Sequence, residues 1–274
     1  MNEDKPRVLI GTPIRQKAEI LSNYLWSIKR LNSDAIDVDF YFIDDNLEEE
    51  SRQLIARFTA ENHNTFLVKA RDDKPYFCNE STHIWEDELI WKVAGFKNSI
   101  INNAREDNYD YVFLVDSDLV LQPQTLEHLV NCGKDIVSEI FWTKWEPDFP
   151  VLPQVWCSDQ YILYNKSRKE SLSENQVLER TLSFLNELKV PGLYKVGGLG
   201  ACTLISKKAI QAGVNFNEIY NTSLVGEDRH FCLRAAALGF ELFVDTHYPA
   251  FHVYRMSDLV ALEKFKMRIQ SINK

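Results

Sequence analysis

Apolar residues alternate between two spacings along the first 120 residues of this chain. Short runs rich in β-branched and aromatic residues predict strands at residues 7–12, 38–43, 65–69 and 110–115. Between them, apolar positions recur at helical spacing and predict helices over residues 19–31, 48–59 and 85–104. Alternation of this kind predicts an α/β fold, with a parallel or mixed central sheet and helices on both faces.

The pattern is less regular after residue 120. Helices are predicted over residues 123–132, 173–188, 227–238 and 257–272, and strands over residues 135–140 and 241–244. Residues 141–164 are rich in Trp, Pro and Tyr without clear periodicity, and a glycine cluster stands at residues 197–200. Because no repeat or long linker interrupts the chain, we expect one domain over residues 1–274, composed of parts 1–120, 121–255 and 256–274.

Three polar clusters stand where predicted strands end. They are Thr12-Pro13-Ile14-Arg15, Asp44-Asp45-Asn46 and Asp116-Ser117-Asp118. In open α/β sheets, ligands bind beyond the carboxyl ends of the strands. The shared position of the clusters therefore predicts a ligand site at this edge of the sheet.

Asp116 and Asp118 directly follow the nearly all-apolar segment 110–115. Burying unpaired charge is costly, and a hard divalent cation such as Mn²⁺ or Mg²⁺ relieves that cost while it bridges carboxylates to diphosphate oxygens. The alternative interpretation is a solvated turn in which an aspartate caps the next helix. Two alternate aspartates alone leave both interpretations open.

Further candidates lie downstream. Glu227 and Asp228 open a predicted helix, where acids commonly serve the helix dipole, but Asp228 is also a candidate general base. His247 and His252 follow a predicted strand, and neutral imidazole is a suitable ligand for Mn²⁺. A lone histidine in aromatic surroundings is more often a core or surface residue, so only the pair carries weight.

In this order and spacing, the motifs resemble glycosyltransferases of the GT-A fold, in particular family 2 and its relatives. The resemblance covers residues 7–254, and its matching positions are Thr12-Pro13, Asp44-Asp45, Lys97-Asn98, Asp116-Ser117-Asp118, the glycine turn at 197–200, the run 226–240 and His252. It implies the Rossmann-like GT-A fold of nucleotide-diphospho-sugar transferases, with a mixed central sheet and helices on both faces.

The resemblance also implies roles for single residues. Asp118 and His252 would bind Mn²⁺ or Mg²⁺, with Asp116 at the metal or at the sugar and His247 as the alternative histidine. Asp228 would be the base of an inverting transfer. Gly197 and Gly198 would let the backbone approach the donor sugar or the acceptor. The nucleotide-sugar contacts would come from Thr12, Pro13, Arg15, Asp44, Asp45, Lys97, Asp116, Ser117, Gly197, Gly198 and Glu227.

The expected reaction is a metal-dependent transfer of a sugar from a nucleoside-diphosphate sugar to an acceptor hydroxyl, in glycan or polysaccharide synthesis. A UDP-sugar is the default donor and a GDP-sugar stays open; the acceptor would be a carbohydrate or a glycosylated molecule. Trp142 and Trp145 are candidates to contact it, although most aromatics of residues 141–164 are expected in a core. The alternatives are a retaining GT-A enzyme, a sugar-phosphate nucleotidyltransferase and a non-catalytic binding module.

Composition narrows the range of partners. The formal net charge of −9 disfavours nucleic acid and anionic lipid. No apolar run approaches the roughly 20 residues of a transmembrane helix, and no signal peptide is visible. Five scattered cysteines suggest reduced thiols, so a cytoplasmic location is expected. The sequence predicts no particular oligomeric state.

Overall fold

The structure, a computed structural model, describes residues 5–70, 86–146, 148–158, 160–222 and 226–272 of the chain. Its strands are β1 (Arg7–Ile14), β2 (Asp37–Asp44), β3 (Thr65–Lys69), β4 (Tyr111–Leu114), β5 (Leu119–Val120), β6 (Ile136–Thr143), β7 (Leu152–Pro153), β8 (Val155–Trp156), β9 (Leu193–Val196), β10 (Gly198–Leu199), β11 (Thr203–Ser206) and β12 (Leu242–His252). Its helices are α1 (Ala18–Ile28), α2 (Glu49–Glu61), α3 (Asp87–Glu106), α4 (Thr125–Asn131), α5 (Glu174–Glu187), α6 (Lys207–Gln211), α7 (Glu227–Ala237) and α8 (Leu259–Ile272), the last preceded by the 3₁₀ turn Met256–Asp258.

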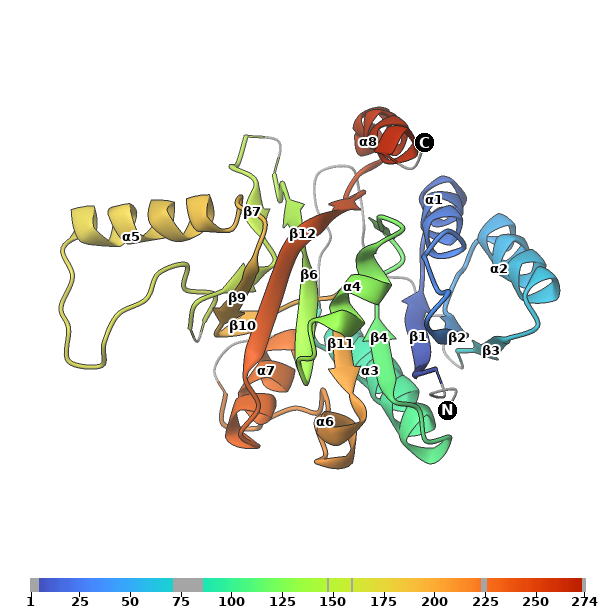
Figure 1. Cartoon of the computed structure of the whole chain (residues 1–274), viewed down its shortest axis with the longest axis horizontal. Helices are drawn as coiled ribbons and strands as arrows, with labels where there is room; N and C mark the ends of the chain where they lie inside the picture. Colours follow the sequence, from blue (N-terminus) through green and yellow to red (C-terminus); the bar gives the residue numbers. More distant parts are fainter. Residues whose placement is uncertain (1–4, 71–85, 147, 159, 223–225, 273–274) are drawn as a thin grey trace.

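One mixed sheet of ten strands organises the described residues (Figure 1). Its order is β3-β2-β1-β4-β11-β6-β12-β5, with β7 paired to β6 and β9 paired to β12. Strands β1 to β4 run parallel where they pair, whereas β11 is antiparallel to both of its neighbours. Strand β12 runs parallel to β6, passes through an irregularity between Asp245 and Ala250, and then pairs antiparallel with β5.

Helices cover both faces of this sheet. Along β1, Leu9 packs into one core cluster with residues of α3, α6 and α7, while its neighbours Val8 and Ile10 pack into a second cluster with residues of α1, α2 and α4. Successive strand residues point to opposite faces, so a strand that is apolar at nearly every position is explained by two covered faces. The predicted α/β class, with a mixed sheet covered on both sides, is confirmed.

The largest departure from the predicted elements is β12. The pattern predicts a strand at residues 241–244, but the strand continues to His252, through the irregularity where the regular alternation is lost. The two-residue strands β5 and β10 and the short β9 are also absent from the predictions, because so few residues carry no period. Trp85, the start of one predicted helix, lies outside the described residues.

Two helices lie away from the central layers. Helix α5 extends to the left of the sheet in Figure 1, and Ser173 begins it with a capping box formed with Gln176. Helix α8 packs Leu262 and Phe265 into a third apolar cluster with Ile20 and Val120 of the same chain. No helix within the described ranges combines the length and the apolar character that crossing a membrane requires.

Candidate active site

A cleft opens at the carboxyl ends of β1, β2 and β4. Apolar side chains of α3 form one wall, including Leu89 and Val93. The opposite side is polar and holds seven of the residues predicted from the sequence: Pro13, Arg15, Asp45, Asp116, Ser117, Asp118 and Glu227. The structure therefore gathers side chains from three strand ends and from the start of α7 around one open space.

The two acids at the end of β2, Asp44 and Asp45, have different partners and different roles. Asp45 is 5% exposed and lies between two cations, with its carboxylate 3.2 Å from Arg15 Nη1 and 2.7 Å from Lys92 Nζ. The Asp44 carboxylate instead accepts hydrogen bonds from the backbone and the side-chain amide of Asn46, at 3.0 and 2.7 Å. Asp44 thus holds the local turn, and Asp45 is the member that lines the cleft.

Thr12 lies beneath the cleft rather than in its wall. Its side chain is fully buried, and its hydroxyl shares a hydrogen bond with the hydroxyl of Tyr24 on α1. Pro13, the next residue, does line the cleft. Side chains of a strand alternate between its faces, which explains why adjacent residues differ in this way.

Asp118 and His252 meet at the cleft, with Asp118 Oδ2 3.5 Å from His252 Nε2. The other oxygen, Asp118 Oδ1, is buried and has no hydrogen-bond partner within the described part of the chain. On its far side, His252 Nδ1 lies 2.8 Å from Thr143 Oγ1, which also accepts a hydrogen bond from Gln154 at 3.1 Å. A buried orphaned carboxylate oxygen beside an oriented imidazole fits the donor set of a divalent cation.

The pairing of β5 with β12 creates this meeting. His252 is in register with Leu119, and the backbone N–H of Val253 donates to the carbonyl of Asp118 at 2.9 Å. His247, the alternative histidine, lies elsewhere: its ring nitrogen is 2.9 Å from Asp245 Oδ2. Of the two candidate histidines, the geometry therefore brings His252 to Asp118.

Lys97 binds the acidic start of α7. It is 3% exposed, and its amine lies 2.9 Å from Glu227 Oε1 and 2.9 Å from Asp228 Oδ1. Gly226 precedes these acids at a φ of 138°, a conformation that favours glycine, and a Cβ there would lie 2.9 Å from the hydroxyl of Tyr161. The glycine thus permits the turn that delivers both carboxylates to Lys97.

Two carboxyl groups near Lys97, those of Asp116 and Asp228, have raised pKa values. Burial raises the pKa of Asp228 to about 6, with Lys97 opposing the rise and Glu227 adding to it. Burial likewise raises the pKa of Asp116 to about 7, against Lys97 and with the help of Asp118 and Asp228. Burial disfavours the charge of Lys97 itself, but Asp228, Glu227 and Asp116 together hold its pKa well above the usual value. Asp228 thus has a pKa close to neutral pH and directly follows Glu227, which lines the cleft, and a carboxylate in this position suits proton transfer.

Gly197 and Gly198 have a different role from the predicted one. A Cβ on Gly197 would lie 2.1 Å from the carbonyl oxygen of Cys157, and one on Gly198 would lie 1.9 Å from the ring of Trp156. Protein already fills the space beside both glycines, because β10 pairs closely with β8. The expected open approach for a sugar is therefore corrected to close packing of two strands. Gly200 is the glycine beside Asp228, whose Oδ2 would be 3.5 Å from an added Cβ.

The aromatic segment 141–164 divides between core and surface. Phe141 and Trp156 are buried and Trp142 packs partly buried against the core, whereas Trp145, Phe149 and Tyr161 are exposed, so fewer of these aromatics are buried than expected. Tyr161 packs against Trp156, and its hydroxyl lies 2.9 Å from the position of a Cβ added at Gly226. Tyr161 is thus an exposed aromatic residue of this segment that lies beside the turn into α7.

Several residues at this site carry no signal in the sequence. Lys92 reaches Asp45 from α3, and Thr143 and Gln154 form the hydrogen-bonded support of His252. Each is an ordinary polar residue in a segment without a motif. Only the fold shows that they face the cleft residues.

Comparisons with known proteins point in one direction. A family model described as glycosyltransferase family 25, N-terminal domain, matches residues 5–172. A comparison with curated proteins finds no match. Among solved structures, the chain resembles S. aureus TarS 1-349, with a TM-score of 0.52, 12% identity, and coverage of 90% of this chain and 60% of that chain.

A second structural likeness is to the mannosyltransferase PcManGT from Pyrobaculum calidifontis, solved in complex with GDP-Man and Mn²⁺. The TM-score is 0.53 at 13% identity, and the match covers 90% of this chain and 57% of that chain. The chain thus spans less than two thirds of the length of these solved structures. Likeness at this level of identity concerns the fold. The family match ends before α5 begins, so it includes neither Asp228 nor His252.

Proposed function

We propose, from the premise that this chain belongs to the family described as glycosyltransferase family 25, N-terminal domain, that it transfers a sugar from a nucleoside-diphosphate sugar to an acceptor hydroxyl with inversion and with a divalent cation. Family membership places the chain among the glycosyltransferases, and its fold is the GT-A fold that the motifs predict. The donor class, the cation and the stereochemical course are the proposal.

One observation carries the proposal. Asp118, with its orphaned oxygen, lines the cleft and faces His252. Glu227 lines the same cleft and shares the amine of Lys97 with its neighbour Asp228. A site for a cation and a candidate base thus stand together at the carboxyl edge of the sheet, where α/β proteins bind nucleotides. The Mn²⁺ and GDP-Man of the mannosyltransferase structure support the same assignment for this chain.

The residues of this chain would divide the work as follows. Asp45, Arg15 and Pro13 would line the nucleotide end of the donor site, and Asp116 and Ser117 its sugar end. Asp118 and His252 would hold Mn²⁺ or Mg²⁺, which when bound supplies positive charge for the leaving diphosphate. Thr143 fixes the ring of His252 from behind.

Asp228 would accept the proton of the acceptor hydroxyl. As that oxygen forms its bond to the anomeric carbon, the bond from the same carbon to the diphosphate oxygen breaks on the opposite face, so the configuration inverts. Lys97 keeps part of the Asp228 population ionised against the effect of burial. Exposed aromatic residues of the segment 141–164, such as Trp145 and Tyr161, would contact the acceptor.

A thermal-shift screen tests the donor and the cation. UDP, GDP and their sugar conjugates are added to the full chain with and without Mn²⁺, and a ligand that binds the folded state raises Tm by mass action. We expect one nucleotide to raise Tm strongly only with Mn²⁺, and Asp118→Ala to abolish that dependence. If no nucleotide shifts Tm with or without the metal, the proposed donor site is wrong.

Transfer assays separate the remaining alternatives. NMR of the product gives its anomeric configuration, and a retained anomer would remove Asp228 from its role as base. Incubation with a sugar phosphate and a nucleoside triphosphate tests for a nucleotidyltransferase, for which we expect no turnover. Full turnover by Asp228→Asn would assign the role of base to another residue, whereas nucleotide-sugar binding without any turnover by the native chain would indicate a non-catalytic binding module.

A further inference from the structure

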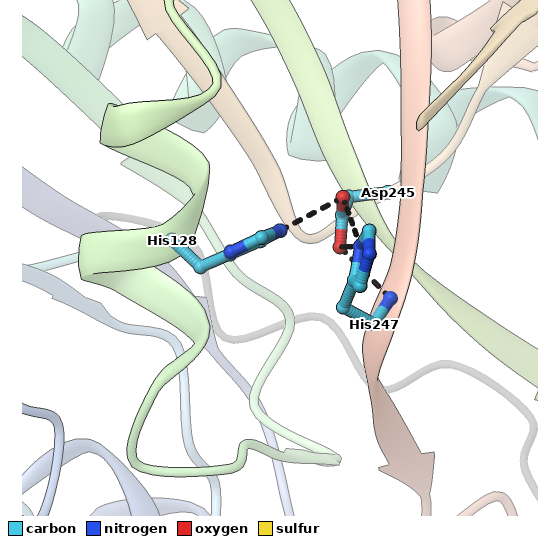
Figure 2. A group of neighbouring side chains, drawn as sticks. All are labelled: His128, Asp245 and His247. Atoms are coloured by element: carbon cyan, nitrogen blue, oxygen red, sulfur yellow. Dashed lines mark hydrogen bonds and ion pairs between the residues drawn. The ribbon is translucent and has the colours of Figure 1, made fainter. Parts of the chain in front are cut away.

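A second group of metal-ligating side chains lies between helix α4 and strand β12, apart from the Asp118–His252 pair (Figure 2). His128 comes from α4, and Asp245 and His247 come from β12. Their candidate ligand atoms all lie within 4.8 Å of one another. Asp245 Oδ2 stands at the centre, 3.0 Å from His128 Nε2 and 2.9 Å from His247 Nδ1.

A buried acid next to this group supplies a second observation. Glu139 on β6 is 1% exposed and is in register with Asp245, which is 0% exposed. Paired residues of neighbouring parallel strands point to the same face, so both carboxylates face the layer that α4 covers. Within the described residues, no partner of either Glu139 oxygen meets strict distance and angle limits, although the backbone N–H groups of Ile140 and Tyr248 and the carboxyl group of Asp245 lie near it.

Two carboxylates buried side by side repel each other and lose their hydration. Two imidazole nitrogens from different elements converge on the same carboxylate oxygen, and this leaves a single point that all three residues face. A divalent cation at that point would be held by His128, Asp245 and His247 and would offset negative charge at the buried acids.

The donor atoms favour a particular class of ion. Two imidazoles and a carboxylate form a set typical of Zn²⁺, which binds nitrogen, sulfur and oxygen ligands in near-tetrahedral sites. Cys132, at the end of α4, adds a thiol 3.9 Å from Asp245 Oδ2. The side chains of His128 and His247 are 29% and 39% exposed, so an ion can reach the site from solvent.

We propose that His128, Asp245 and His247 form a zinc site that fastens α4 to β12. The site lies at the start of the irregular part of β12, and the strand beyond it carries His252 to Asp118. Zinc would therefore stabilise the approach of β12 to the cleft without taking part in sugar transfer. The proposal does not rest on the proposed function.

The test is zinc binding by the full chain after its metals have been removed with a chelator. Calorimetric titration with Zn²⁺ compares the native chain with His128→Gln and His247→Asn, whose amides keep a hydrogen bond to Asp245 but replace the imidazole. We expect each substitution to weaken zinc binding at least tenfold. His63→Ala, at an exposed histidine, is the matched control and should bind zinc as the native chain does.

Two further measurements make the result decisive. Zn²⁺ should raise the Tm of the native chain and of His63→Ala but not that of His128→Gln, whose metal-free Tm reports on its folding. Co²⁺ in place of Zn²⁺ should give the visible absorption of a site with nitrogen ligands, and Asp118→Ala should keep it. The proposal is overturned if the native chain binds no zinc, if both histidine variants bind it unchanged, or if only Asp118→Ala loses it.

Discussion

Two pairs of adjacent acids each supply one residue to the lining of the cleft, Asp45 and Glu227, and the structure balances the charges of the two pairs differently. Asp44 is satisfied by its own turn, and Asp45 lies between Arg15 and Lys92. The second pair, Glu227 and Asp228, shares the amine of Lys97, and Asp116 adds a further nearby negative charge. In the first pair, two cations contact the single carboxylate of Asp45. In the second pair, the single amine of Lys97 contacts two carboxylates, so negative charge is in excess.

This difference separates binding from chemistry. A buried acid held between two cations is fixed in place, which suits the recognition of a ligand. Burial raises the pKa of Asp228 to about 6, Lys97 opposes the rise and the neighbouring Glu227 adds to it. The uncompensated pair is thus the place to expect proton transfer.

The largest effect is expected from Asp228→Asn. The amide keeps the shape of the side chain but cannot accept a proton, and a positioned base contributes about 10²- to 10⁴-fold to rate. We expect kcat to fall by that range while the Kd of the nucleotide changes little. Asp45→Asn is the matched control in the first pair and should weaken nucleotide binding more than it lowers kcat. Similar kcat losses in both variants would erase the distinction between the pairs.

Lys97 and Lys92 offer a direct comparison within α3. Lys97→Met leaves two carboxylates without their partner at a buried position, which costs about 3 kcal/mol of unfolding free energy. Lys92→Met removes a partner from Asp45, which keeps Arg15, so its cost is about 1 kcal/mol or less. Urea denaturation of both variants measures the difference. Equal losses would show that the two lysines are equivalent.

The pH dependence follows from the pKa of Asp228. Because the base must be ionised, kcat/KM should fall about tenfold per pH unit below pH 6 and level off above it. The raised pKa also means that folded Asp228 binds more protons than unfolded Asp228 between about pH 4 and 6, so its contribution to stability declines as pH rises through that window. Lys97 lowers this pKa, so the acidic limb should move to higher pH in Lys97→Met. A limb that does not move assigns the profile to another group.

The smallest effect is expected from Arg15→Ala. Asp45 keeps Lys92, and the cleft loses one of its positive charges. We expect nucleotide Kd to rise about fivefold, or about 1 kcal/mol, with kcat unchanged. Titration with the nucleotide that raises Tm most gives the number. A large drop in kcat would place Arg15 at the reacting end of the donor instead.

Much of the first half could be predicted from the sequence, because its elements are long and regular. Strand β3 has the predicted bounds, and α1 to α3 differ from the predictions by a few residues at their ends. The polar clusters after β1, β2 and β4 meet at one cleft because the carboxyl ends of parallel strands share an edge. Hydrophobic periodicity, together with the rule that ligands bind at the carboxyl ends of parallel strands, is enough to predict this part of the fold and of the site.

The second half needs information that no local pattern holds. His252 reaches Asp118 only because β12 changes partner from β6 to the two-residue β5. The side chain of Lys97 turns to α7 because Gly226 permits the turn before it. Gly197 and Gly198 pack against β8, and a glycine cluster alone does not distinguish such packing from an open site. Long-range pairing decides each of these cases.

The contacts between Lys97 and Asp228 join residues 131 positions apart, and those between Thr143 and His252 join residues 109 positions apart. Closing loops of this length has an entropic cost, and non-local contacts slow folding. The acidic side of the site therefore depends on elements from both halves of the chain, and losing either half would remove it.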